Sequence, residues 1–88
     1  MATYKVTILP SALDQLAELP RYDQKKIKER IDRLGVDPHL PGVKKLKGES
    51  DLFRLRCGNY RIIYSIDDVR LIVLVIRIGH RRDAYRGL

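Results

Sequence analysis

Residues 52–78 of this 88-residue chain read LFRLRCGNYRIIYSIDDVRLIVLVIRI, and this stretch decides the fold. It predicts three strands, Leu52–Cys57, Tyr60–Ile66 and Val69–Ile78, because it is rich in β-branched and aromatic residues and is divided by turn signals. Gly58-Asn59 is a signal for a two-residue hairpin turn, and Asp67-Asp68 is a weaker one. We therefore expect consecutive antiparallel strands joined by tight turns.

The preceding half of the chain supplies the other elements. Residues 4–9, YKVTIL, predict a first strand, and residues 10–19 predict a helix bounded by two prolines. A second helix is expected from Asp23 to Leu34, with Gly35 as the first residue beyond it. The order β-α-α-β-β-β over residues 1–88 predicts a single α+β domain, with two N-terminal helices packed on one face of a small, mainly antiparallel four-stranded sheet.

The hairpin turn also fixes which side chains share a face of the sheet. A two-residue turn at Gly58-Asn59 places Cys57 opposite Tyr60 and Arg56 opposite Arg61, and side chains alternate along each strand. The apolar face, where the helices should pack, then carries Phe53, Leu55, Cys57, Tyr60, Ile62, Tyr64, Leu71, Val73 and Val75. The second face carries Arg54, Arg56, Arg61, Ile63, Ile72, Leu74 and Ile76.

Composition narrows the class of function. The chain has 18 basic and 11 acidic residues, a net charge of +7. Residues 1–43 hold seven basic and six acidic residues, whereas residues 44–88 hold eleven and five. Cationic charge gathered in one half is typical of a protein that binds a polyanion, and strands rather than a basic amphipathic helix carry it, which favours nucleic acid over a membrane surface.

Cysteine content and hydropathy exclude other classes. A single cysteine excludes an internal disulfide and a cysteine-based zinc site. The longest apolar run, residues 71–76, is far shorter than the roughly 20 residues of a membrane span. We expect a cytoplasmic protein with no membrane contact, in which Cys57 is a small core residue and His39, between two prolines, is inert.

The second face of the sheet carries the functional signal. The side chains of Arg56 and Arg61 would be directly opposed, and two like charges in this position destabilise a hairpin. Packing of the sheet therefore gives no reason for this pair. Arginine forks suit phosphate oxygens, and the segment GHRRDAY, residues 79–85, should emerge at the same end of the sheet. The alternative is that the arginines pair with nearby carboxylates, for which the candidates are Glu49, Asp51 and Asp83.

The runs LFRLRCGNYRIIYSID and RIGHRRDAYR, in this order within a short basic chain, resemble the RelE-type toxins of bacterial and archaeal toxin–antitoxin systems. The resemblance implies a RelE-like, microbial-RNase-like fold. It further implies an endoribonuclease that enters the ribosomal A site and cuts messenger RNA without a metal or other cofactor, thereby inhibiting translation. By this resemblance Arg61 and Arg81 take part in catalysis or phosphate contact, and Tyr85 matches an aromatic residue near the tail.

Cleavage by the RNA's own 2′-hydroxyl needs a base, an acid and cations around the phosphorane. Arginine suits only the last role, so His80 and Tyr85 are the candidates for proton transfer, and either could be the base or the acid. The alternative is that His80 is only an exposed histidine and that Tyr85 only anchors the tail on the sheet. The expected catalytic residues are Arg56, Arg61, His80, Arg81 and Tyr85. Further RNA contacts are expected from Lys44, Lys45, Lys47, Arg54, Arg77 and Arg82.

The second face also leaves apolar side chains without a covering helix. Such a patch suggests a partner, unless the C-terminal tail covers it. The resemblance implies a cognate acidic antitoxin, with operator DNA bound only through the antitoxin complex. The residues expected to contact this antitoxin are Ile63, Ile72, Leu74 and Ile76. Two other functions stay open, a ParE-like poison of DNA gyrase and a non-catalytic RNA-binding or co-repressor module.

Overall fold

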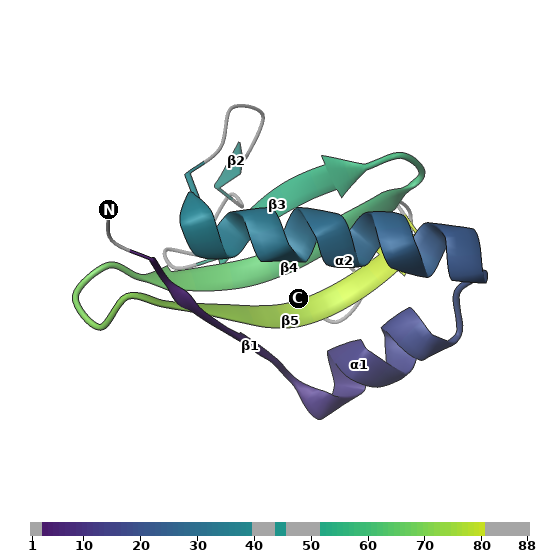
Figure 1. Cartoon of the computed structure of the whole chain (residues 1–88), viewed down its shortest axis with the longest axis horizontal. Coiled ribbons are helices and arrows are strands. Elements are labelled where there is room, and N and C mark those ends of the chain that lie inside the picture. The colour runs from purple at the N-terminus through teal and green to yellow at the C-terminus, as the bar shows by residue number, and fades with distance from the viewer. Residues whose placement is uncertain (1–2, 40–43, 46–51, 81–88) are drawn as a thin grey trace.

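The computed structural model describes residues 3–39, 44–45 and 52–80 (Figure 1). Two helices follow a short first strand, and the remaining strands come after them in the chain. The elements are β1 (Lys5–Ile8), α1 (Pro10–Ala17), α2 (Arg21–Val36), β2 (Lys44–Lys45), β3 (Leu52–Cys57), β4 (Tyr60–Asp67) and β5 (Ile72–His80).

The strands form one mixed sheet in the order β1-β5-β4-β3-β2. β1 pairs parallel to β5. Parallel neighbours need a long connection, which here contains both helices and the strands β2 to β4. All the other pairings are antiparallel. The predicted β-α-α-β-β-β order is confirmed, and the two-residue strand β2 extends the expected four strands at one edge.

The first hairpin has the predicted register. Cys57 pairs with Tyr60 and Arg56 pairs with Arg61 across β3 and β4. Gly58 has a φ of 60°, whereas Asn59 is not among the residues with positive φ. This is the pattern of a type II′ turn, whose twist matches that of the strands it joins.

The second hairpin differs from the prediction. Asp67 still belongs to β4, and the turn is a four-residue loop, 68–71, rather than the dipeptide Asp67-Asp68. The Asp67 carboxylate accepts the backbone N–H groups of Val69 and Arg70 at 3.0 and 2.8 Å, and Leu71 closes the loop with a φ of 57°. An aspartate side chain that caps the loop backbone in this way stabilises a wider turn.

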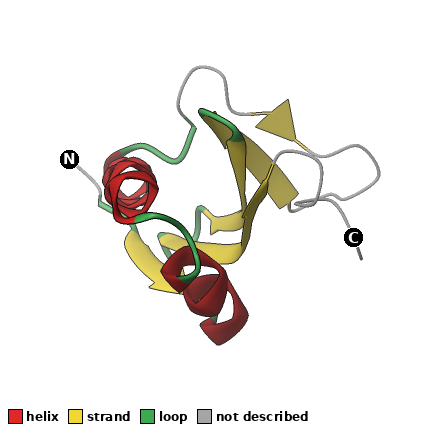
Figure 2. Cartoon of the chain, turned by 90° about the vertical axis from the view of Figure 1, so that its right-hand side faces the viewer, coloured by secondary structure: helices red, strands yellow, loops and turns green. Residues whose placement is uncertain are grey.

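Both helices pack on the predicted apolar face of the sheet, and the sheet itself is curved (Figure 2). Each fully buried aliphatic side chain of this interface contributes about 1.5–3 kcal/mol to stability. The buried residues of this core are Ala12, Leu16, Ile27, Ile31, Leu34, Leu55, Cys57, Ile62, Tyr64, Val73, Val75 and Ile78.

Gly35 lies inside α2 and not beyond its end, so the predicted helix boundary is wrong. Its carbonyl oxygen accepts the N–H of Tyr4 at 2.7 Å, just before β1. A Cβ at this position would lie 3.1 Å from Cγ2 of Val6. The glycine is therefore needed for the close approach of α2 to the first strand, and the helix continues to Val36.

Side-chain hydrogen bonds connect the loops at the end of the sheet away from the Gly58-Asn59 turn. The Tyr64 hydroxyl donates to the carbonyl oxygen of Pro38 at 2.9 Å, inside the core. The Asp68 carboxylate accepts the Tyr4 hydroxyl at 2.6 Å and lies 3.1 Å from Nε2 of His39. His39, expected to be inert, thus has a structural role between two loops.

Candidate functional site

Four arginines lie on the sheet face that the helices leave uncovered. Arg56 is the direct partner of Arg61, and Ile63 pairs with Arg54 on one side and Arg77 on the other. Directly paired residues project from the same face of a sheet. We call the surface made by Arg54, Arg56, Arg61 and Arg77 the arginine face. Arg56 is exposed, and the other three side chains are half-buried.

A β-bulge places Arg77 on this face. The register between β4 and β5 shifts at Ile63 and Tyr64, so that Tyr64 pairs with Val75 while Ile63 pairs with Arg77. Without the bulge, regular alternation from Val75 would put Arg77 on the helix side of the sheet. The extra residue in β5, Ile76, reverses the faces beyond it. The bulge therefore adds a fourth guanidinium to three that alternation alone brings together.

The same bulge removes His80 from the arginine face. His80 pairs with Tyr60, a residue of the helix-side face, and the two rings meet edge-on with centroids 6.0 Å apart. The expectation that the imidazole joins the arginines is corrected, because β5 carries one residue more than regular pairing allows. The strand nevertheless ends at the Gly58-Asn59 turn as expected, since Gly79 pairs with Arg61.

Several expected site residues lie outside the described residues. These are Lys47 in the connection to β3, and Arg81, Arg82 and Tyr85 after β5. The three carboxylates considered as alternative arginine partners, Glu49, Asp51 and Asp83, also lie there. Lys44 and Lys45 form β2, whose backbone pairs with β3 so that Lys44 is the partner of Arg54.

The apolar residues of the uncovered face differ in exposure. Ile63 is fully buried between its two arginine neighbours, so the expectation that it offers a contact surface to a partner is corrected. Aliphatic stems of arginine cover apolar surface while the charged heads stay in water. The half-buried residues of this face are Ile72, Leu74 and Ile76.

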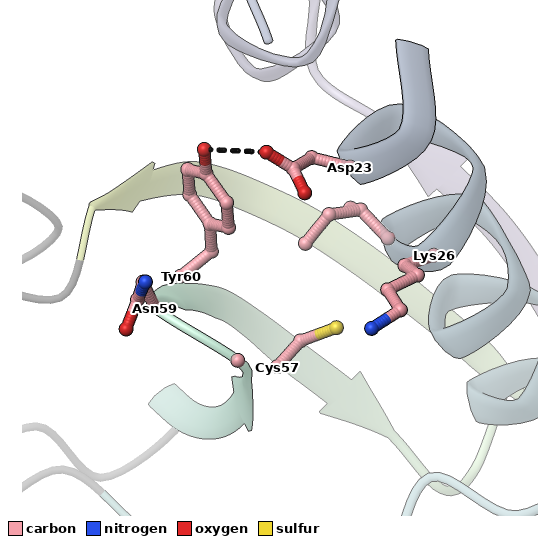
Figure 3. Close-up of a pocket in the computed structure, with 7 residues that line it drawn as sticks. Asp23, Lys26, Cys57, Asn59 and Tyr60 are labelled. Carbon is pink, nitrogen blue, oxygen red and sulfur yellow. Dashed lines mark hydrogen bonds between the residues drawn. The ribbon is translucent and has the colours of Figure 1, made fainter. Parts of the chain in front are cut away.

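A pocket of about 200 Å³ lies on the other side of the hairpin, between α2 and the Gly58-Asn59 turn (Figure 3). The Tyr60 hydroxyl donates to Oδ2 of Asp23 at 2.9 Å, which raises the pKa of Tyr60. The sequence placed Tyr60 on the helix-side face but gave no sign of its partner, 37 residues away. The pocket is lined by Asp23, Lys26, Ile27, Cys57, Gly58, Asn59 and Tyr60.

Cys57 is a core residue, as predicted. Its side chain is 7% exposed, and burial raises the pKa of its thiol, against the smaller lowering effect of Arg30 and Lys26. A protonated thiol is a poor nucleophile and a poor metal ligand. Within residues 3–39, 44–45 and 52–80, no group of three His, Cys, Asp or Glu side chains could hold a metal ion.

This fold, with a cationic face opposite its helices, is that of a small toxin. The family model described as "ParE toxin of type II toxin-antitoxin system, parDE" matches residues 6–85. The chain therefore belongs to this family of toxins from type II toxin–antitoxin systems. The resemblance to RelE-type toxins is also confirmed, since relatives and solved structures named RelE, of the same RelE/ParE superfamily, match the chain.

The relatives cover nearly the whole chain. Toxin RelG of Mycobacterium tuberculosis is 31% identical over 84 residues, which are 94% of this chain and 97% of the relative. The mRNA interferase toxin RelE of Escherichia coli K12 is 28% identical over 72 residues, 80% of this chain and 75% of the relative.

Solved structures give the same result for the fold. The toxin in the RelBE2 toxin–antitoxin complex of M. tuberculosis is 32% identical with a TM-score of 0.80, covering 90% of this chain and 99% of that one. The archaeal RelE–RelB complex from Pyrococcus horikoshii is 32% identical with a TM-score of 0.79, covering 90% of this chain and 96% of that chain.

Neither described helix is both long and apolar enough to pass through a lipid bilayer.

Proposed function

We propose that this toxin is a ribosome-dependent messenger RNA endoribonuclease, which cleaves by attack of a 2′-hydroxyl on the adjacent phosphodiester. The observation that carries the proposal is the arginine face, where guanidinium groups from three neighbouring strands share one surface. The proposal is also supported by the E. coli relative that is named an mRNA interferase, at 28% identity. Ribosome and messenger would be its partners, and it would act in the cytoplasm.

The chemistry of the arginine face fits phosphoryl transfer. Arginine stays protonated at any ordinary pH, so its role is to stabilise charge and not to move protons. The phosphorane formed in cleavage carries more negative charge than the phosphodiester, and fixed cations beside it lower the barrier. Arg56 and Arg61, being direct partners at the end of the hairpin, are the pair that we place at the scissile phosphate.

Further RNA contacts in the proposal come from both flanks of that pair. Arg54 and Arg77 continue the arginine face along the sheet. Arg81 and Arg82 follow the strand end, and Lys44, Lys45 and Lys47 precede β3 in the chain. Each added phosphate contact steepens the dependence of affinity on salt.

Proton transfer is assigned to Tyr85 in this proposal. His80 projects from the opposite face, beside Tyr60, so it is placed to assist only from the edge of the site. A pH–rate profile that keeps its shape in His80→Gln and changes in Tyr85→Phe supports this assignment. The reverse pattern would return the role to His80.

The test is controlled expression followed by mapping of messenger 5′ ends. Wild-type toxin should cut inside translated reading frames, and Arg61→Ala should lower cleavage about a hundredfold, the usual effect of losing one group that stabilises a transition state. Arg33→Ala is the matched control, because Arg33 is an exposed arginine of α2 on the other side of the sheet. Equal cleavage by wild type and Arg61→Ala rejects the proposal.

A second candidate function comes from the family model, whose description names the ParE toxin. We infer from it that poisoning of DNA gyrase is the main alternative. The same expression experiment separates the two, since gyrase poisoning produces DNA breaks that depend on gyrase and leaves messenger 5′ ends unchanged.

The antitoxin is proposed to bind the apolar part of the uncovered face. Related toxins were solved as complexes with a RelB antitoxin. Half-buried Ile72, Leu74 and Ile76 lie on the same sheet as the arginines, a combination that suits an acidic segment with apolar anchors. Operator DNA would be bound through that complex. Leu74→Asp should weaken antitoxin binding, and Lys28→Asp, at an exposed position of α2 on the other side of the sheet, is the control that should not.

A further inference from the structure

We propose that the pocket between α2 and the Gly58-Asn59 turn binds one amine-bearing nucleobase, guanine best, of the RNA strand whose phosphates lie on the arginine face. This proposal depends on the proposed function, because it adds a base-reading site to the same RNA substrate. It takes the pocket of Figure 3 as the binding site.

The pocket offers complementary polar groups at its two sides. Oδ2 of Asp23 accepts the Tyr60 hydroxyl, and the other carboxylate oxygen turns into the space between α2 and the hairpin (Figure 3). The Lys26 side chain reaches into the same space from the next turn of the helix. A carboxylate accepts hydrogen bonds from ring and exocyclic N–H groups, and an ammonium donates to carbonyl or ring acceptors, which is the pattern of guanine.

The walls and size of the pocket suit a planar ring. Tyr60 supplies an aromatic side chain and Ile27 an apolar one. The volume of about 200 Å³ is below the roughly 300–1,000 Å³ of sites for drug-sized ligands, so a single base fits better than a whole nucleotide. Unstacked RNA bases are commonly held against aromatic side chains and read by hydrogen bonds along their edges.

The hairpin turn connects the pocket with the arginine face. Nε of Arg56 donates to the carbonyl oxygen of Gly58 at 3.4 Å, so the guanidinium lies against the turn. Gly58 and Asn59 of that turn also line the pocket. A phosphate on Arg56 and a base in the pocket would therefore contact the same two-residue turn.

Two cationic residues of α2 lie at or near the pocket, of which Lys26 lines it. Tyr22 is 69% exposed and Nζ of Lys26 lies 4.9 Å from the centre of its ring. Arg30 lies one turn further along the helix and is near enough to act electrostatically on Cys57. These groups favour the approach of an anionic strand to the pocket from the helix side.

The proposal is tested by binding of short uridine RNAs, 2′-O-methylated so that they cannot be cleaved, each with one central guanine, inosine or adenine. Fluorescence anisotropy with the whole toxin should show guanine bound about tenfold more tightly than inosine, which lacks the exocyclic amine. Asp23→Asn should abolish that difference, because the amide keeps an acceptor for Tyr60 but loses the charge. Asp32→Asn, on the exposed side of α2, is the matched control and should keep it.

The outcomes separate this proposal from the proposed function. RNA binding without a difference between guanine and inosine, or a difference that survives Asp23→Asn, overturns the pocket proposal alone. If expression of the wild-type toxin produces no messenger cleavage in cells while the purified toxin still prefers guanine, the endoribonuclease proposal is rejected and the base-binding pocket is retained. Lys26→Gln should weaken the binding of guanine and inosine alike, because both bases carry the carbonyl acceptor that Lys26 is proposed to contact, whereas Lys28→Gln on the same helix should weaken neither.

Discussion

Arg56 and Arg61 are direct partners across the β3–β4 hairpin, two positive charges on adjacent strands. Like charges in this position destabilise a sheet by a few tenths of a kcal/mol up to about 1 kcal/mol. Both lie on the face that the helices leave uncovered. In the proposed function this pair binds the phosphate, so we expect stability and cleavage to respond to Arg56 in opposite directions.

Replacing Arg56 with threonine should therefore make the isolated toxin more stable and less active. Removal of the opposed charge raises the free energy of unfolding by up to about 1 kcal/mol. The measurement is urea unfolding, followed by messenger cleavage at equal toxin concentration. Lys5→Thr is the matched control, because Lys5 is an exposed basic strand residue whose partner is Ile72. A loss of stability in Arg56→Thr would contradict the argument.

The arginine pair was predictable because a short turn fixes the register of its hairpin. Once Gly58-Asn59 is identified as a two-residue turn, the partnership of Arg56 with Arg61 follows by counting, and the faces of β3 and β4 follow by alternation. The same argument places Cys57 in the core. The confirmed register of this hairpin is therefore a consequence of local sequence.

The side-chain directions in β5 were less predictable, because the bulge in this strand has no clear sequence signal. The bulge in β5 falls in a run of isoleucine, valine and leucine, where any register buries apolar surface. It moves Arg77 onto the arginine face and His80 off it. The bond between Tyr60 and Asp23 depends on how α2 crosses the sheet, which is a tertiary property.

Gly35→Ala should destabilise the toxin, although alanine is worth about 1 kcal/mol more than glycine in a helix. The new Cβ would lie 3.1 Å from Val6 Cγ2 and 3.3 Å from the Tyr4 carbonyl oxygen, so α2 must move away from β1. That movement strains the hydrogen bond from the Tyr4 N–H to the Gly35 carbonyl. Thermal unfolding measures the net effect, and a higher Tm than wild type would show that the contact yields easily.

Tyr64→Phe should lower the free energy of unfolding by about 1–3 kcal/mol, the cost of leaving a buried polar group without its partner. The hydroxyl donates to the Pro38 carbonyl oxygen at 2.9 Å inside the core, and burial raises the pKa of this tyrosine. Urea unfolding is the measurement. Tyr22→Phe, at a side chain that is 69% exposed, should change stability far less. Equal effects in the two variants would show that the Pro38 bond contributes little.

Acid should weaken the fold partly through Asp68. The hydrogen bond from the Tyr4 hydroxyl lowers the pKa of the Asp68 carboxyl, and the contact with His39 lowers it further. A depressed pKa stabilises the folded state above the unfolded value of about 3.9, and this contribution is lost as the pH falls through the lower folded value. Asp68→Asn should therefore reduce the difference in unfolding free energy between about pH 5 and about pH 2. Asp32→Asn should leave the difference close to that of wild type. An unchanged acid dependence in Asp68→Asn would mean that the contacts with Tyr4 and His39 do not persist in solution.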